Sequence, residues 1–245
     1  MGKRIVVIVS LSLASLLLIG FSGCNNGVAP EENNLTESVV ESPENENGLA
    51  MPLPPVEEGF VAEALYNRVS RRSYSDQALQ LSQIGSLLWS AGGINVDGLT
   101  GPTRTSPSAG ARYPIDIYLV AGSVEGLEAD IYRYNYENHA LEPVVLEDRR
   151  LTLAEAALGQ GFIAEAPVAI VLVAYYERTT DRYGDRGERY VYMDAGYASQ
   201  SIYLKAEEMG LATVAVGAFD DAEIAGVLLT EGKPLLIMPV GYKPS

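Results

Sequence analysis

The first sixty residues confine any folded core to the remainder of the chain. Lys3 and Arg4 precede an apolar run at residues 5–21, and small residues then lead into Cys24, the only cysteine. A basic start followed by such a run is typical of a secretory signal. The run also approaches the roughly 17 apolar residues of the shortest membrane-spanning helices, so an uncleaved anchor remains the alternative.

Cys24 occupies the place that the lipidated cysteine has in a bacterial lipobox, although Phe21 is a poorer match there than the usual leucine. A lone cysteine is most often a buried structural residue. Cys24, however, lies between the apolar run and a polar segment, where no core is expected. We therefore predict that Cys24 is lipidated and that it anchors an extracytoplasmic protein to the cell membrane or outer membrane.

A polar segment at residues 25–58 separates the signal from the rest of the chain. It is rich in Asn, Glu, Ser and Pro, it has no aromatic residue, and no Lys or Arg occurs between Arg4 and Arg68. Such a composition cannot bury enough apolar surface to offset the entropy of ordering. We predict three parts: a signal at 1–24, a disordered acidic linker at 25–58 and a folded domain at 59–245.

Composition excludes several classes of function. The formal net charge is −15 at pH 7, whereas nucleic-acid binding depends on Lys and Arg replacing counterions. A single cysteine and a single histidine, His139, argue against internal disulfides and against a zinc site with two histidines. We interpret His139 as a solvated turn residue, and we predict neither a metal nor a nucleic-acid partner.

Apolar periodicity gives a coarse secondary structure. Helices are predicted at residues 62–69, 81–91, 151–158 and, longest of all, 193–209. Strands are predicted at residues 115–120, 131–136, 140–145, 168–174, 212–216 and 235–240. Because helices and strands do not alternate regularly, we predict an α+β fold with a mixed central sheet flanked by helices. The longest helix begins with small residues, which would let another helix or a flat ligand approach closely.

Three segments are candidates for chemistry. Arg71, Arg72 and Ser73 follow the first predicted helix, and guanidinium and hydroxyl groups suit phosphate oxygens. Residues 107–114 form a stiff, small-residue loop before a strand, and Gly217-Ala218 follow a strand. Taken separately, the arginine segment is better explained as a solvated basic patch, and the small-residue loop also has the composition of many structural turns.

Together and in this order, the segments resemble the nitroreductase family, and most closely its branch of SagB-like dehydrogenases, which includes azoline oxidases of peptide maturation. The resemblance covers about residues 64–244. The Pro-Ser-Ala-Gly-Ala-x-Tyr-Pro run at 107–114 and the helix at 194–211 carry most of it. The Gly-Ala-Phe-Asp run at 217–220 and the Pro-Val-Gly-Tyr run at 239–242 extend it.

The resemblance implies a homodimer with FMN at each of two subunit interfaces, the long helix in the dimer core, and hydride transfer at flavin N5 to or from a small organic substrate. Arg71 and Ser73 match the positions that hold the FMN phosphate and ribityl chain, with Arg72 between them. The residues that match the loop along the isoalloxazine ring are Pro107, Ser108, Ala109 and Gly110. Gly217 and Ala218 match the backbone facing the N5 edge.

Two departures from the family pattern matter. Ser75 stands where many relatives have a basic residue, so Lys243 is the candidate for the missing phosphate contact. Arg182-Tyr183 stands where azoline oxidases have Lys-Tyr. Arginine cannot act as a proton acceptor at ordinary pH, which puts azoline oxidation in doubt and leaves Tyr183 as the candidate proton donor.

Other features leave alternatives open. The arginines of the predicted loop at 178–189 suit an anionic substrate, and a solvated charged loop describes them equally well. Within the enzyme class, nitro or quinone reduction and substrate dehydrogenation both remain. The rival from another class is a non-catalytic flavin-binding or scaffold lipoprotein that retains the dimer fold.

Overall fold

The computed structural model describes residues 59–96 and 102–244, both within the predicted folded domain. The predicted signal, Cys24 and the linker lie outside the described residues. The described part has an α+β fold, as predicted, built around a six-stranded sheet of order β7-β6-β4-β8-β10-β9. In the described part of the chain, no helix has the length and apolar character needed to cross a membrane.

The strands of the central sheet follow the predicted apolar runs closely. Their bounds are β4 (Ile115–Ala121), β6 (Ile131–Asn135), β7 (Ala140–Val145), β8 (Val168–Ala174), β9 (Leu211–Thr213) and β10 (Lys233–Tyr242). All neighbouring strands of the central sheet pair antiparallel. A parallel pair occurs outside this sheet, between β1 (Leu79–Gln80) and β5 (Val124–Glu125). A further short pair consists of β2 (Ile94–Val96) and β3 (Pro102–Arg104).

Strand β8 is central, as its uninterrupted apolar sequence predicted. All seven of its residues are buried, and it pairs with β4 on one side and β10 on the other. Successive side chains of a strand point to opposite faces. Accordingly, Val168, Ile170 and Leu172 enter one hydrophobic cluster, whereas the residues between them enter the other.

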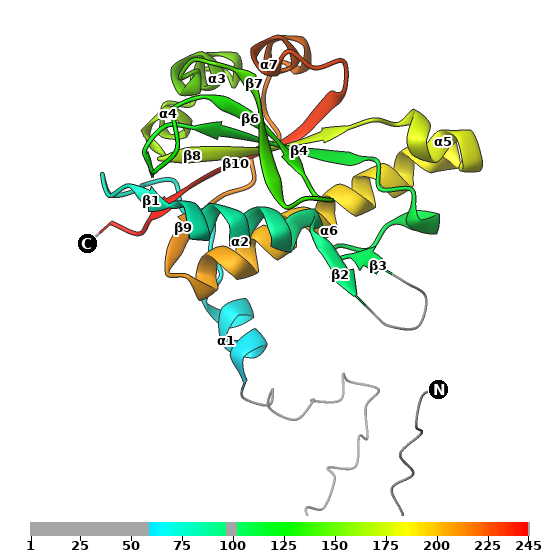
Figure 1. Ribbon diagram of the computed structural model, residues 1–245, viewed down its shortest axis with the longest axis horizontal. Helices are drawn as coiled ribbons and strands as arrows, with labels where there is room; N and C mark the ends of the chain where they lie inside the picture. Colours follow the sequence, from blue (N-terminus) through cyan, green and yellow to red (C-terminus); the bar gives the residue numbers. More distant parts are fainter. Residues whose placement is uncertain (1–58, 97–101, 245) are drawn as a thin grey trace, which may run out of the picture. The chain divides into compact units, whose positions relative to one another are not determined.

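The helices form a layer on each face of this sheet (Figure 1). Their bounds are α1 (Phe60–Asn67), α2 (Leu81–Gly92), α3 (Arg150–Ala156), α4 (Phe162–Glu165), α5 (Glu177–Tyr183), α6 (Arg186–Glu208) and α7 (Asp221–Leu228). Helices α2 and α6 share the cluster on one face, and α3, α4 and α7 share the cluster on the other. The short helices α4, α5 and α7 are additions to the prediction.

The prediction of a loop at 178–189 is wrong, because most of this segment is helical. It consists of α5 and the start of α6, which begins at Arg186 rather than Met193. Gly184 has a φ of 55°, which no helical residue adopts, and it therefore ends α5 before α6 begins. At Gly187, an added Cβ would lie 2.8 Å from the Cα of Thr180, so the missing side chain allows α5 to pack tightly on α6.

The small residues of α6 face inward for the most part. Ala195, Ala198 and Ser199 are buried, and the first two share a cluster with α2. The closely approaching helix that these residues predicted is therefore α2 of the same chain. Gly196 differs because it is exposed, and an added Cβ there would meet nothing within 4 Å.

Candidate functional site

The arginine segment after α1 is fixed to the central sheet. The backbone N–H of Arg71 donates to the Thr213 carbonyl of β9 at 2.9 Å. The Tyr74 hydroxyl reaches the carbonyls of Arg71 and Pro239, at 3.3 and 3.4 Å. Burial raises the pKa of Tyr74 well above its usual value, so its hydroxyl remains a donor across the physiological pH range.

The two cations predicted to bind phosphate converge on one carboxylate. Glu207 Oε2 accepts from Arg71 Nη1 at 3.0 Å, and Glu207 Oε1 accepts from Lys243 Nζ at 2.6 Å. The Glu207 side chain is 9% exposed, compared with 28% for Arg71 and 33% for Lys243. Their donors therefore already hold an oxyanion while keeping access to solvent, which fits the phosphate end of FMN.

The remaining residues of this segment are open to solvent. Arg72 and Ser73 are exposed, and the guanidinium carbon of Arg72 lies 5.9 Å from the centre of the Phe162 ring. Thus Arg72 does not join the contact between Arg71, Glu207 and Lys243.

Gly217 and Ala218 directly follow Val216, which forms an isolated antiparallel β-bridge with Ile237 of β10. Val216 exchanges two backbone hydrogen bonds with Ile237, at 2.8 and 2.9 Å, and the Ala218 carbonyl accepts from the side chain of Gln160 at 2.8 Å. Both Gly217 and Ala218 are exposed, and an added Cβ at Gly217 would meet only Leu236, at 3.9 Å. This peptide edge is accessible to a flat ligand, as the N5 edge of a flavin requires.

We call these residues the phosphate-side group: Arg71, Arg72, Ser73, Gly217, Ala218 and Lys243. The contact of Arg71 with Thr213 places the arginine segment beside the strand that leads toward Gly217. Glu207, at the end of α6, joins Arg71 to Lys243.

The loop at 107–114 is held by a carboxylate of α6. The Ser108 hydroxyl donates to Asp194 Oδ2 at 2.6 Å and accepts from the Tyr113 backbone N–H at 2.8 Å. The Ala109 N–H also donates to Asp194. Because the Ser108 hydroxyl proton is bound to Asp194, this side chain fixes the loop and has no donor left for a flavin.

Among the described residues, Asp194 is the only buried residue with a charged side chain, and it is 5% exposed. Burial raises its pKa, and the hydrogen bonds from Ser108 and the Ala109 N–H oppose this rise.

Arg182 and Tyr183 approach the same loop. Gly110 has a φ of 59°, and an added Cβ would collide with the Tyr183 hydroxyl and lie 3.3 Å from Arg182 Nη1. The Tyr183 ring packs edge-on against Tyr190, with ring centres 5.1 Å apart. A side chain at position 110 would be strained by the positive φ, and it would displace the ends of the Tyr183 and Arg182 side chains.

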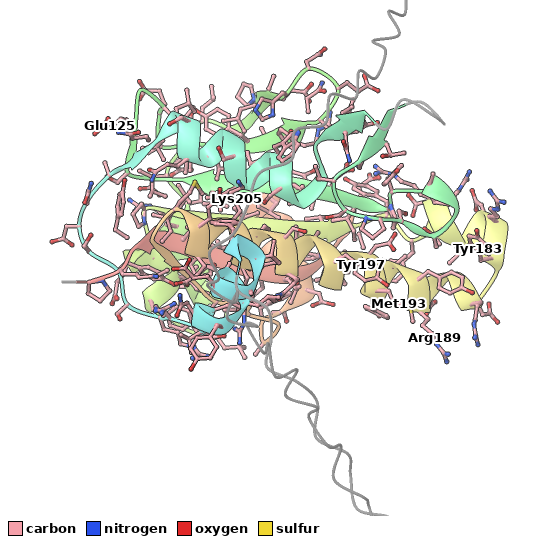
Figure 2. All side chains as sticks on the ribbon, turned by 90° about the horizontal axis from the view of Figure 1, so that it is seen from below. Glu125, Tyr183, Arg189, Met193, Tyr197 and Lys205 are labelled. Atoms are coloured by element: carbon pink, nitrogen blue, oxygen red, sulfur yellow. The ribbon has the colours of Figure 1, made fainter. Side chains whose placement is uncertain are left out.

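We call the second set the ring-side group: Pro107, Ser108, Ala109, Gly110, Arg182 and Tyr183. It lies near the start of α6, at the end that Tyr183 marks in Figure 2, whereas Arg71 and Lys243 of the phosphate-side group contact Glu207 near the other end of α6. Asp194 and Glu207, which hold the two groups, are 13 positions apart on α6, or about 20 Å along its axis. Among the described residues, no hydrogen bond or ion pair joins the two groups.

Arg178 does not belong to an anion-binding loop, contrary to one of the two interpretations of that segment. Its guanidinium binds both oxygens of Asp116 on β4, at 2.6 and 3.1 Å, and thereby fastens α5 to the sheet. This hydrogen bonding raises the pKa of Arg178. Arg182, Arg186 and Arg189 remain exposed.

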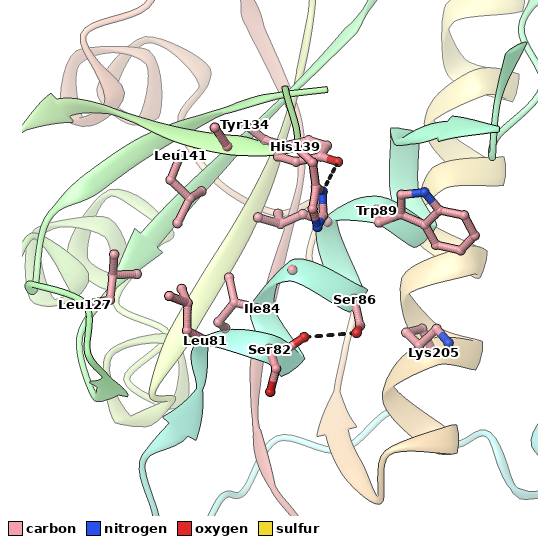
Figure 3. A pocket seen from close by; sticks show the side chains of 13 residues that line it. Leu81, Ser82, Ile84, Ser86, Trp89, Leu127, Tyr134, His139, Leu141 and Lys205 are labelled. Atoms are coloured by element: carbon pink, nitrogen blue, oxygen red, sulfur yellow. Dashed lines mark hydrogen bonds between the residues drawn. The ribbon is translucent and has the colours of Figure 1, made fainter. Parts of the chain in front are cut away.

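His139 is exposed in the β6–β7 turn, as interpreted, and its Nδ1 lies 2.8 Å from the Tyr134 hydroxyl. It lines an open hollow of about 850 Å³ between α2 and this hairpin, whose walls include Leu81, Ile84 and Leu141 (Figure 3). Neither the phosphate-side nor the ring-side group lines this hollow. Within the described residues, no three side chains of the usual ligand types gather as a metal site would require.

Sequence reasoning missed Asp194 and Glu207, the carboxylates that organise the two groups. The signal that could have revealed them is their placement on α6 at positions otherwise occupied by small or apolar residues. Asp194 precedes Ala195 on the inner face, and Glu207 follows the buried Ala206.

The family model described as the nitroreductase family matches residues 65–242. The chain belongs to the nitroreductase family. It is 43% identical over 195 residues to a candidate nitroreductase of Methanocaldococcus jannaschii, covering 80% of this chain and 97% of that protein. Its identity to the microcin B17-processing protein McbC of Escherichia coli is 27% over 146 residues, 56% of this chain and 54% of McbC.

A solved structure shows the same fold. The crystal structure of a candidate nitroreductase from Ralstonia eutropha JMP134 aligns with a TM-score of 0.66 and 29% identity, covering 79% of this chain and 88% of that one. Family membership makes the chain a nitroreductase-family oxidoreductase, and such enzymes are typically FMN-dependent. Its homologues include McbC of the SagB-like branch.

Proposed function

We propose that this protein is an FMN-dependent oxidoreductase whose flavin site is assembled from two copies of the chain. The observation that carries this proposal is the separation of the phosphate-side and ring-side groups along α6. The two carboxylates that hold residues matching one cofactor site in the family, Asp194 and Glu207, lie about 20 Å apart along α6 of a single chain. A second copy, related by a two-fold axis, can bring the ring-side group of one chain to the phosphate-side group of the other.

Exposed apolar side chains support this pairing. The outer face of α6 carries Met193 and Tyr197, 46% and 48% exposed, beside the exposed Gly196. Both side chains are labelled in Figure 2. Helix α1 adds Val61 and Tyr66, which are 61% and 91% exposed. Large apolar side chains concentrated on two helices are typical of a surface that a partner covers.

The residues present have the hydrogen-bond donors that the FMN phosphate needs. Bound FMN would supply hydride transfer at its N5 atom. Arg71 and Lys243 would hold the phosphate, with Arg72 and Ser73 beside them. The Gly217-Ala218 backbone would face the N5 edge.

The ring-side group would cover the flavin from the other chain. The loop of Pro107, Ser108, Ala109 and Gly110 would lie along the ring. Tyr183 would hold the proton to be exchanged with the substrate, and Arg182, which cannot accept a proton, would supply positive charge beside it.

The same proposal extends to the location and the electron partner. A lipidated Cys24 holds the domain outside the cytoplasm, where no pool of NADH or NADPH is at hand. A small organic substrate, a quinone, oxygen or a membrane redox protein would then exchange electrons with the flavin. Rapid anaerobic bleaching of the flavin by micromolar NADH or NADPH would contradict this part of the proposal.

The visible spectrum and mass of the purified full-length protein test the proposal. A yellow dimer with one FMN per chain, bleached by a reductant, supports an enzyme with a shared site. A colourless protein that cannot be reconstituted with FMN favours the scaffold alternative. A yellow monomer with full FMN affinity overturns the shared site.

A further inference from the structure

A polar hollow of about 440 Å³ adjoins the ring-side loop. It shares Arg104 and Tyr113 with the smaller pocket against Pro107 and Ser108. Its volume falls in the range of roughly 300–1,000 Å³ that is usual for small-molecule sites. Four arginines and three carboxylates line it, an excess of positive charge in a chain whose net charge is −15.

Two of the four arginines are neutralised within the protein. Arg178 binds Asp116 through two hydrogen bonds, and Arg133 binds Glu142 at 2.8 Å. Asn135 also donates to Glu142, at 2.7 Å. These residues are the fixed walls of the hollow, and they leave Arg104 and Arg112 as its available cations.

Arg104 is preorganised by stacking. Its guanidinium carbon lies 3.4 Å from the centre of the Tyr136 ring and 4.5 Å from that of Tyr113. A guanidinium stacked on aromatic rings keeps its N–H donors in its own plane, where they match the two oxygens of a carboxylate. The Tyr113 hydroxyl is fixed in turn, because it accepts from the Arg104 backbone N–H at 3.3 Å.

Arg112 lies within the loop at 107–114, eight positions after Arg104. Its Nε donates to the Arg178 carbonyl at 2.7 Å, which orients the guanidinium and leaves its terminal nitrogens available. Within residues 59–96 and 102–244, no carboxylate forms an ion pair with Arg104 or Arg112.

We infer that this hollow binds the carboxylate of a small organic substrate, with Arg104 and Arg112 as its partners. Tyr113, Tyr134 and Tyr136 line the same space and offer apolar ring surface to the body of such a molecule. The inference rests on the proposed function, since it names the substrate class of the site that the ring-side loop helps to form. Arg104 and Arg112 would then bind the anion, because Arg178 is already paired with Asp116.

Calorimetric binding of benzoate and of benzamide, its neutral analogue of nearly the same shape, tests the inference on the full-length chain in detergent. We expect benzoate to bind at least tenfold more tightly than benzamide. Arg104→Gln and Arg112→Gln should each weaken benzoate binding about tenfold, because each removes charge-assisted hydrogen bonds. Arg149→Gln, which removes an arginine outside the hollow, is the matched control, and circular dichroism verifies that each variant is folded.

Equal affinity for benzoate and benzamide would overturn the inference, as would benzoate binding that neither hollow variant weakens. The flavin spectrum, recorded beforehand, separates this failure from failure of the proposed function. A yellow dimer without preference for benzoate contradicts the hollow alone. A colourless protein that prefers benzoate, and loses the preference in Arg112→Gln, supports the carboxylate site and contradicts the flavin site.

Discussion

Ser108 donates its hydroxyl to Asp194 at 2.6 Å, and this bond ties the loop before β4 to the inner side of α6. The same hydroxyl accepts from the Tyr113 N–H at 2.8 Å. One side chain thus acts as donor and acceptor at once, and it fixes both ends of the loop predicted to lie along the flavin. Ser108 is therefore a positioning residue rather than a direct ligand.

Ser108→Ala should destabilise the protein by about 1.5–3 kcal/mol, because a buried carboxylate loses a charge-assisted hydrogen bond. Urea unfolding at neutral pH measures this difference. Ser201→Ala is the control, since the Ser201 hydroxyl donates only to the Tyr197 carbonyl at an exposed site. Equal stability losses in the two variants would show that the Ser108 bond has no special weight.

The ionisation of Asp194 should make stability depend on pH. Its pKa is raised by burial, so its contribution is complete below its unfolded pKa of about 3.9 and is lost as pH rises through the folded pKa. Asp194→Asn cannot ionise. We expect the free energy of unfolding of the wild type, relative to this variant, to fall as the pH rises above the unfolded pKa. A constant or rising difference above that pKa would be the contrary result.

Glu207→Gln should change how strongly FMN stabilises the protein. Without the carboxylate, Arg71 and Lys243 lose their shared partner, which should destabilise the FMN-free form by about 1–2 kcal/mol because both cations are partly exposed. The FMN phosphate can replace the lost carboxylate, so the FMN-induced rise in Tm should exceed that of the wild type.

The neighbouring residue provides the control for this experiment. Glu208→Gln removes an exposed carboxylate that pairs with Lys205. It should leave the effect of FMN on Tm unchanged. If FMN raised the Tm of both variants and of the wild type by the same amount, Glu207 would not be part of the phosphate site.

Cys24→Ser should abolish labelling by a fatty-acid probe and release the protein from membranes. The reason is that Cys24 is the only cysteine and follows the apolar run directly. Labelling and membrane fractionation measure the two effects independently. A wild type that takes up no label, or a variant that stays membrane-bound, favours the uncleaved anchor.

Sequence patterns predicted the parts of the fold whose burial is regular. The uninterrupted apolar run of β8 reveals its burial directly, because such a run is expected of a strand that is covered on both faces. The charged segment at 178–189 gave no such signal, because its helices are held by contacts distant in sequence. The ion pair of Arg178 with Asp116, 62 positions away, is an example.

The candidate site divides in the same way. Family motifs indicated Arg71, Ser108, Gly110 and Gly217 as candidates, because short segments retain their own sequence pattern. The partner carboxylates lie far away in the chain: 86 positions separate Ser108 from Asp194, and 136 separate Arg71 from Glu207. Pairings over such distances depend on how α6 packs, which no local pattern records.

Subunit mixing tests the shared flavin site most directly. Arg71→Ala damages the phosphate-side group, and Gly110→Val damages the ring-side group by colliding with Tyr183. A heterodimer of the two variants, isolated with two affinity tags, should contain one intact site and one doubly damaged site. We predict that it binds one FMN per dimer with wild-type affinity, although each variant homodimer binds FMN weakly. A heterodimer without any wild-type site would contradict the account, because it would mean that both groups act within one chain.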